Sequence, residues 1–145
     1  SRFAPMDFGT VLTPAEMDFS LRLMRIHSEL SALLVKYHPD MLAVEKLYFK
    51  NNQKTAIDVA QARGVILLAA QQCGIPIYEY TPLQVKSAVT GYGKAEKPQV
   101  MEMTRRLLGL REVPKPDYAA DALAIAICHA QTCGTPLKRR LAGML

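Results

Sequence analysis

The chain has 145 residues, of which 50% are apolar and 21% are charged, and this balance is typical of one globular domain. The composition excludes disordered, collagen-like and disulfide-rich chains, and a net charge of +5 favours a polyanionic partner without identifying one. The longest apolar run, 64–70, is far shorter than the ~20 residues of a membrane span, and residues 1–10 lack the features of a secretory signal. The three cysteines have no C-x-x-C spacing and suit a reducing compartment. We therefore expect a cytoplasmic protein.

The first half of the chain alternates between predicted strands and helices. Residues 2–12 predict one irregular strand. Residues 13–16 place a capping threonine, a proline and a glutamate where a helix starts, and the apolar spacing then predicts a helix down to Pro39. Its predicted buried face consists of Phe19, Leu23, Ile26, Leu30, Leu33 and Tyr37. The apolar run 41–44 predicts a strand buried on both faces, and residues 52–72 predict a helix rich in small residues.

The second half continues the same alternation. Residues 75–80 alternate like a strand, and Thr81-Pro82-Leu83-Gln84 repeats the capping pattern. A helix is expected from about residue 95 to Leu108, where Gly109 ends it, and another from near Asp117 to just before Gly134. Alternating strands and helices predict an α/β fold in a single domain spanning 1–145.

Three acidic residues lie where chemistry is plausible. Glu45 directly follows an apolar strand, at the end of a sheet where ligands of α/β proteins collect, although a solvated glutamate opening a loop is an equal alternative. Asp121 interrupts an otherwise apolar helix, and Asp117, four residues earlier, lies on the same helix face. Asp117 also fits a purely structural role at the helix N-terminus. Clustered acids on a basic chain suggest a divalent metal and therefore a nuclease.

The segment after Glu45 has a composition suited to nucleic acid. Tyr48 and Phe49 are adjacent aromatics between Lys46 and Lys50, which could stack on unpaired bases and neutralise phosphates. At least one of the two aromatics could equally belong to the core. The three histidines show no metal-binding spacing, and the chain has no glycine-rich phosphate motif.

Five short motifs together resemble the RuvC family of bacterial Holliday junction resolvases. They are Leu42-Ala43-Val44-Glu45, Gln61-Ala62-Arg63-Gly64, Gln84-Val85-Lys86, Ala95-Glu96-Lys97 and Ala119-Ala120-Asp121-Ala122-Leu123-Ala124. The likeness extends from Phe3 to about His129, with the motifs in the order and spacing of the family.

The resemblance implies a fold and an activity. The family has an RNase H-like fold, a mixed sheet flanked by helices, and acts as a homodimer that cuts two opposed strands of four-way junction DNA, with branch-migration helicases as partners. Four acidic positions hold Mg²⁺, two ions per site, with Mn²⁺ as a substitute. Glu45 and Asp121 match two of these positions.

The resemblance also assigns roles outside the acidic set. Lys86 and Lys97 match lysines near the scissile phosphate, where they would hold substrate or offset developing charge. The DNA-binding residues expected on this basis are Lys46, Tyr48, Phe49, Lys50, Lys86 and Lys97. The helix around Ala60 and Gly64 is a candidate dimer contact, although packing on its own sheet explains its small residues equally well.

The chain departs from the family pattern at the other two acidic positions. The strand that carries the first acid has no counterpart, because the chain begins at the family's third strand, and Asp7 lies in that third strand. Tyr118 stands where relatives usually have Asp or sometimes His, and the adjacent Asp117 is only a weak substitute because one helical residue is about 100° of rotation. We therefore expect strongly impaired cleavage, or alternatively a non-catalytic junction-binding remnant or module.

Overall fold

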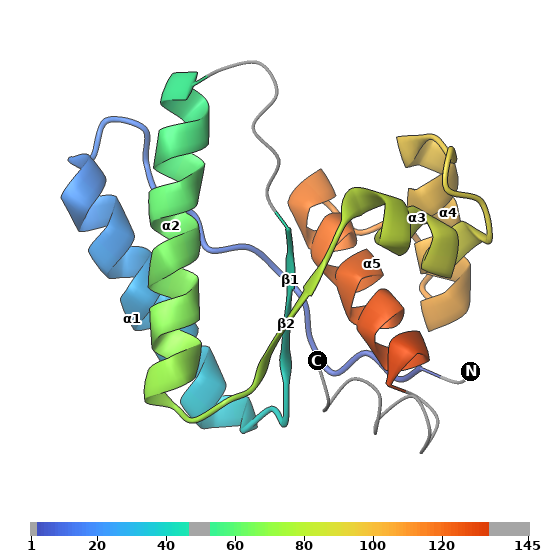
Figure 1. The fold of residues 1–145 in the computed structure, drawn as a ribbon, viewed down its shortest axis with the longest axis horizontal. Helices are drawn as coiled ribbons and strands as arrows, with labels where there is room; N and C mark the ends of the chain where they lie inside the picture. Colours follow the sequence, from blue (N-terminus) through green and yellow to red (C-terminus); the bar gives the residue numbers. More distant parts are fainter. Residues whose placement is uncertain (1–2, 47–52, 134–145) are drawn as a thin grey trace. The chain divides into compact units, whose positions relative to one another are not determined.

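The computed structural model describes residues 3–46 and 53–133, which contain five helices and two strands (Figure 1). In chain order they are α1 (Phe19–Tyr37), β1 (Leu42–Glu45), α2 (Gln53–Gln72), β2 (Ile77–Tyr80), α3 (Pro82–Thr90), α4 (Lys97–Leu108) and α5 (Asp117–Thr132). None of these helices has both the length and the apolar character that crossing a membrane requires. The alternation of strand and helix confirms the predicted α/β class.

The strands β1 and β2 lie side by side and run parallel. The Leu42 N–H donates to the Pro76 carbonyl at 2.9 Å, and the Lys46 N–H donates to the Tyr80 carbonyl at 2.7 Å. Both bonds join residues at the same sequence offset, so the register is constant along the pair. Leu42, Ala43 and Val44 are half-buried and Glu45 is exposed, so β1 is not buried on both faces as the apolar run predicts.

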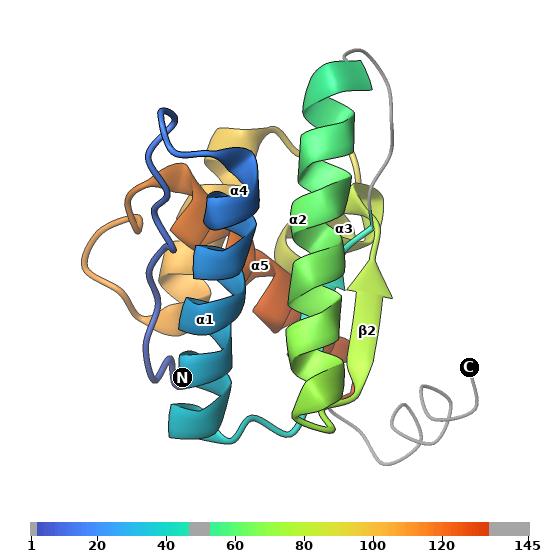
Figure 2. The same ribbon diagram turned by 90° about the vertical axis from the view of Figure 1, so that its left-hand side faces the viewer.

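The contacts of the chain divide it into two compact units. One comprises Val11–Leu42 and Leu47–Tyr78, and the other comprises Ser1–Thr10, Ala43–Lys46 and Glu79–Leu145. In the first unit α1 packs along α2 (Figure 2). The core of this unit consists of Leu34, Ala69, Ala70 and Ile75, with Leu30, Leu42 and Ile77 packed against it. Ala69 and Ala70 are fully buried, and their small side chains permit this close helix contact.

Three predictions for the N-terminal region are wrong. The helix α1 begins at Phe19 and not at the capping pattern of residues 13–16, because residues 14–17 form a turn in which the Met17 N–H donates to the Pro14 carbonyl at 3.2 Å. The Thr13 hydroxyl accepts a hydrogen bond from Arg22 Nε at 2.9 Å. Residues 3–12 form no strand, since the sheet of the described residues consists of β1 and β2. On α1 itself Leu34, 5% exposed, is buried in place of Leu33, 41% exposed.

In the second unit α3, α4 and α5 pack together (Figure 1). The predicted capping pattern starts α3, because the Thr81 hydroxyl accepts from the Gln84 N–H at 3.1 Å and Gln84 Oε1 accepts from the Thr81 N–H at 2.8 Å. The buried face of α5 consists of Ala119, Ala120, Leu123, Ala124, Ile127, Cys128 and His129. This face holds α5 against its neighbours, with the polar side of its first two turns left accessible.

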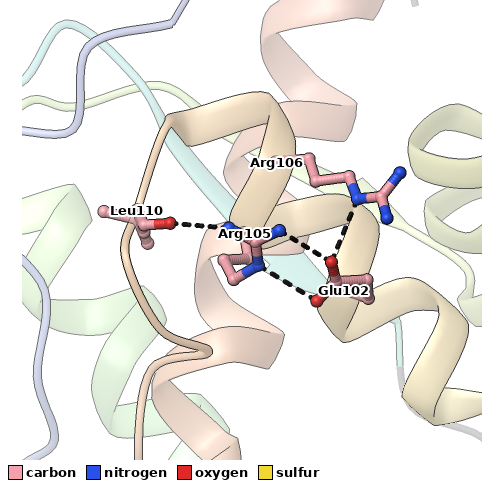
Figure 3. Close-up of polar contacts among 4 residues, drawn as sticks. All are labelled: Glu102, Arg105, Arg106 and Leu110. Carbon is pink, nitrogen blue, oxygen red and sulfur yellow. Dashed lines mark hydrogen bonds and ion pairs between the residues drawn. The ribbon is translucent and has the colours of Figure 1, made fainter.

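The C-terminal end of α4 is held by a compact ion cluster (Figure 3). The Glu102 carboxylate accepts two hydrogen bonds from Arg105, from Nε at 3.0 Å and from Nη2 at 2.7 Å. It accepts a third from Arg106 Nε at 3.0 Å. Arg105 also donates to the Leu110 carbonyl at 2.9 Å, beyond the turn at Gly109. These contacts satisfy backbone and side-chain groups at the helix end and hold the pKa of Glu102 at about 2, chiefly through the hydrogen bonds from the two arginines.

Candidate active site

Charged side chains from β1, α3, α4 and α5 meet in a cavity of about 440 Å³ in the second unit. Its charged lining includes Glu45, Lys86, Lys97 and Asp121, together with Lys94 and Glu96 from the connection between α3 and α4. Apolar side chains, among them Val85, Val100 and Ala124, form the rest of the wall. The structure therefore brings together four residues that the sequence analysis selected from distant positions.

Local structure explains how each of these side chains reaches the cavity. Glu45 is the last residue of β1, and the bond from the Lys46 N–H to Tyr80 holds this strand end in the sheet. On α3 the buried Val85 anchors the helix, and the adjacent Lys86 is left half-buried at the cavity. Lys97 is the first residue of α4, so its side chain is not constrained by a preceding helical turn.

Lys97 forms an ion pair with both aspartates of α5. Its Nζ lies 3.6 Å from Asp117 Oδ2 and 3.6 Å from Asp121 Oδ2, and all three side chains are about half exposed. Because the two aspartates are one turn apart, they present their carboxylates to the same ammonium group. Tyr118, which lies between them in sequence, is 75% exposed and does not line the cavity.

The electrostatics of Glu45 reflect this crowding of charge. Its pKa is raised above the ordinary value, first by partial desolvation and then by the negative charge of Asp121, while Lys86 and Lys97 act in the opposite direction. The two carboxylates therefore repel each other, and nearby ammonium groups offset part of this repulsion. A cation placed between Glu45 and Asp121 would relieve it further.

The donor set fits a sparsely coordinated hard cation. Within residues 3–46 and 53–133 no group of three or more histidine, cysteine, aspartate or glutamate side chains forms a metal-binding cluster. Mg²⁺ does not need such a cluster, because it commonly takes one or two carboxylates and completes its shell with water and phosphate oxygens. Glu45 and Asp121 meet that requirement, with Asp117 as a further carboxylate beside Lys97.

Not every predicted site residue can be placed. Tyr48, Phe49 and Lys50 lie outside the described residues, and Lys46 is exposed at the end of β1. Lys94 and Glu96 line the cavity but were not predicted as site residues, although their position in the short connection before α4 was a usable signal. A buried pair, Tyr80 and His129, was not predicted either, and the sequence offers no local signal for it.

Solved structures define the class of protein. The structure is similar to that of RuvC from Thermus thermophilus, with a TM-score of 0.77 and 42% identity over 83% of this chain and 72% of that one. A structure of Thermus thermophilus RuvC in complex with Holliday junction substrate matches with a TM-score of 0.79, 42% identity and coverage of 83% and 73%. The fold is thus RNase H-like, as predicted. The cavity contains carboxylates and lysines, and the chain is a nuclease of the RNase H-like class.

Sequence comparison gives the family. The profile described as crossover junction endodeoxyribonuclease RuvC matches residues 1–129. A curated relative of that description from Desulfitobacterium hafniense (strain DSM 10664 / DCB-2) is 53% identical over 145 residues, which is all of this chain and 87% of the relative. Another from Syntrophomonas wolfei is 56% identical over 128 residues, or 88% of this chain and 74% of the relative. The chain belongs to the RuvC family of crossover junction endodeoxyribonucleases, which confirms the resemblance found in its motifs.

Proposed function

We propose that this chain hydrolyses phosphodiester bonds of four-way DNA junctions during recombination and repair, using the cavity around Glu45 and Asp121. The observation that carries the proposal is the convergence of these two carboxylates with Lys86 and Lys97 from four separate elements. The Thermus thermophilus relative whose structure contains a Holliday junction substrate supports four-way DNA as the ligand.

The family is one of metal-dependent nucleases, and we propose Mg²⁺ as the ion, two per site, with Mn²⁺ as a substitute. Glu45 and Asp121 would hold the metal, and Asp117 is the further ligand that the geometry favours, because it shares the Lys97 ammonium with Asp121. When bound, a divalent ion supplies a more acidic water and neutralises phosphate charge. The carboxylates of this chain contribute the binding and orientation of the ion.

The two lysines have a second task at the same cavity. Lys86 and Lys97 carry positive charge to a site whose DNA ligand is an anion, so they would hold the phosphate and stabilise negative charge that develops on it. Lys97 would hold the phosphate with the same ammonium group that lies 3.6 Å from Asp117 and from Asp121. Lys46, with Tyr48, Phe49 and Lys50, would extend the DNA contact beyond the cavity.

The remaining partners follow the family pattern. We propose a cytoplasmic homodimer that works with branch-migration helicases. The small residues of α2 support a dimer contact there, because Gly64 is exposed and a Cβ built on it meets no atom within 4 Å. Sedimentation of the wild type beside Gly64→Arg tests this role, since a dimer contact predicts dissociation of the variant and internal packing alone predicts no change in mass.

Cleavage should be slower than in relatives with an acid at the position of Tyr118. A tyrosine that is 75% exposed offers no carboxylate to the site, and each 1.36 kcal/mol lost from transition-state stabilisation is about tenfold in rate. The same observation favours the second candidate function, a module that binds junction DNA without cutting it.

One experiment separates the two functions. The chain is incubated with a labelled four-way junction and with linear duplex, each in Mg²⁺ or in EDTA, and binding and strand cleavage are scored together. Paired nicks in the junction that require Mg²⁺ are the expected result. Junction binding without any nick would replace the nuclease by the binding module, and equal binding of duplex and junction would contradict both.

A further inference from the structure

Tyr80 connects two parts of the active site without lining it. It is the last residue of β2, and its carbonyl accepts from the Lys46 N–H at 2.7 Å, directly after Glu45. Its backbone thereby holds the strand end that presents Glu45. Its side chain points elsewhere, into the interior of the same unit, where it is 6% exposed.

The Tyr80 side chain contacts the helix that carries Asp121. Its hydroxyl oxygen lies 2.5 Å from His129 Nδ1, and the two rings are 5.6 Å apart between centroids. His129 is also buried, and it follows Asp121 on α5 by about two helical turns. Asp121 and His129 belong to one uninterrupted helix, because α5 is continuous from Asp117 to Thr132.

Both partners of this contact are uncharged at neutral pH. Burial raises the pKa of the Tyr80 phenol to about 12 and lowers the pKa of His129. The phenol and the imidazole therefore meet as two neutral groups, and one hydrogen bond joins the Tyr80 hydroxyl to His129 Nδ1. A second contact on the same helix, from Cys128 Sγ to the Gln84 carbonyl at 3.6 Å, joins α5 to α3 but does not reach β1.

We propose that the hydrogen bond between Tyr80 and His129 is a positioning link that sets the separation of the Glu45 and Asp121 carboxylates. The link runs from the strand end of Glu45 through the backbone and side chain of Tyr80 to α5. Neither Tyr80 nor His129 touches the cavity, so both act through the carboxylates. The inference deepens the proposed function, because a metal shared by Glu45 and Asp121 requires their separation to be constant.

The first readout is a distance, which needs neither metal nor activity. Spin labels are placed at Lys46→Cys and Ala122→Cys, both exposed positions, with the exposed Cys73 replaced by serine and the buried cysteines retained. Electron paramagnetic resonance then measures the distance between the labels in this doubly labelled parent protein and in three variants of it. The variants are Tyr80→Phe, the double variant Tyr80→Phe with His129→Leu, and Ile127→Val. The last is the matched control, because Ile127 is fully buried on α5 but has no part in the link.

A positioning link predicts a broader distance distribution in Tyr80→Phe and in the double variant but not in Ile127→Val. The double variant replaces both polar partners by apolar groups, so it removes the penalty of a buried unpaired group and should fold even if Tyr80→Phe does not. A distribution in the folded double variant that matches the parent would overturn the proposal. Failure of the double variant to fold would also overturn it, by assigning the pair to stability alone.

The second readout is the binding of Mn²⁺ to unlabelled protein. The double variant should bind Mn²⁺ roughly tenfold to hundredfold more weakly than wild type, while its affinity for a four-way junction in EDTA is unchanged. If the distances respond as predicted and the wild type binds no Mn²⁺, the positioning link stands and the proposed metal-dependent function fails. Unchanged Mn²⁺ affinity in a folded double variant would refute the effect of the link on the site.

Discussion

Replacing Lys97 by methionine should change metal binding and cleavage in opposite directions. In the absence of metal the Lys97 ammonium occupies the position between the Asp117 and Asp121 carboxylates, at 3.6 Å from each. The ammonium therefore competes electrostatically with a divalent ion for these carboxylates. Lys97→Met removes this competition, and it also removes a positive charge that would face the phosphate of bound DNA.

The size of the effect follows from the geometry. Two unit charges at 3.6 Å attract by about 1 kcal/mol in the dielectric of water, and exposed ion pairs contribute roughly 0.2–1 kcal/mol each. Since all three side chains are about half exposed, we take about 1 kcal/mol for the two pairs together. At 1.4 kcal/mol per factor of ten, Mn²⁺ should bind about fivefold more tightly to Lys97→Met. Loss of charge stabilisation should slow junction cleavage roughly tenfold to hundredfold.

Titration calorimetry with Mn²⁺ and single-turnover cleavage of a labelled junction measure the two effects. Lys94→Met is the matched control, because Lys94 lines the same cavity and shows no ion pair to the acids among the described residues. It removes the same charge and should leave Mn²⁺ affinity within about twofold of wild type. Unchanged or weaker Mn²⁺ binding in Lys97→Met would refute the competition between the ammonium and the metal.

Three further variants test the acidic side chains. Tyr118→Asp should speed junction cleavage at least about tenfold without lowering the melting temperature, because residue 118 is exposed; an unchanged rate would show that Tyr118 does not limit the enzyme. Asp117→Asn should weaken Mn²⁺ binding in calorimetry if Asp117 is a ligand, and unaltered affinity would limit the metal set to Glu45 and Asp121. Glu102 has a folded-state pKa of about 2, below its ordinary 4.5, so its contribution to stability is present above pH 4.5 and lost as the pH falls toward 2. The difference in melting temperature between wild type and Glu102→Gln should therefore vanish over that range. A constant difference would contradict a stabilising role of the charged Glu102 carboxylate.

Local patterns predicted the elements well where the deciding contacts were also local. The start of α3 depends on Thr81 and Gln84, which bond to each other's backbone three residues apart, and the pattern identified it. The start of α1 was predicted too early, because residues 14–17 form a turn that does not continue as a helix and the Thr13 hydroxyl contacts Arg22, nine residues away. A contact at that distance cannot be inferred from the capping pattern alone.

The site was predictable only in part, for a similar reason. Glu45 and Asp121 stood out as acids next to apolar segments, whereas Lys86 and Lys97 read as surface lysines until the family resemblance selected them. The contact of Tyr80 with His129 spans 49 residues and joins a strand end to a helix, so the periodicity of the sequence does not predict it. Motif spacing identifies the chemistry of a site, but the packing of elements decides which side chains support it.

The proposed cleavage of junction DNA depends on Glu45 and Asp121 acting as one metal-binding pair. The most direct measurement compares wild type, Glu45→Gln and Asp121→Asn for cleavage and binding of a labelled four-way junction in Mg²⁺. We predict slow, Mg²⁺-dependent paired nicks by the wild type and none by either variant, with junction affinity retained by all three. Equal nicking by wild type and either variant would contradict the role of Glu45 and Asp121 as the metal-binding pair.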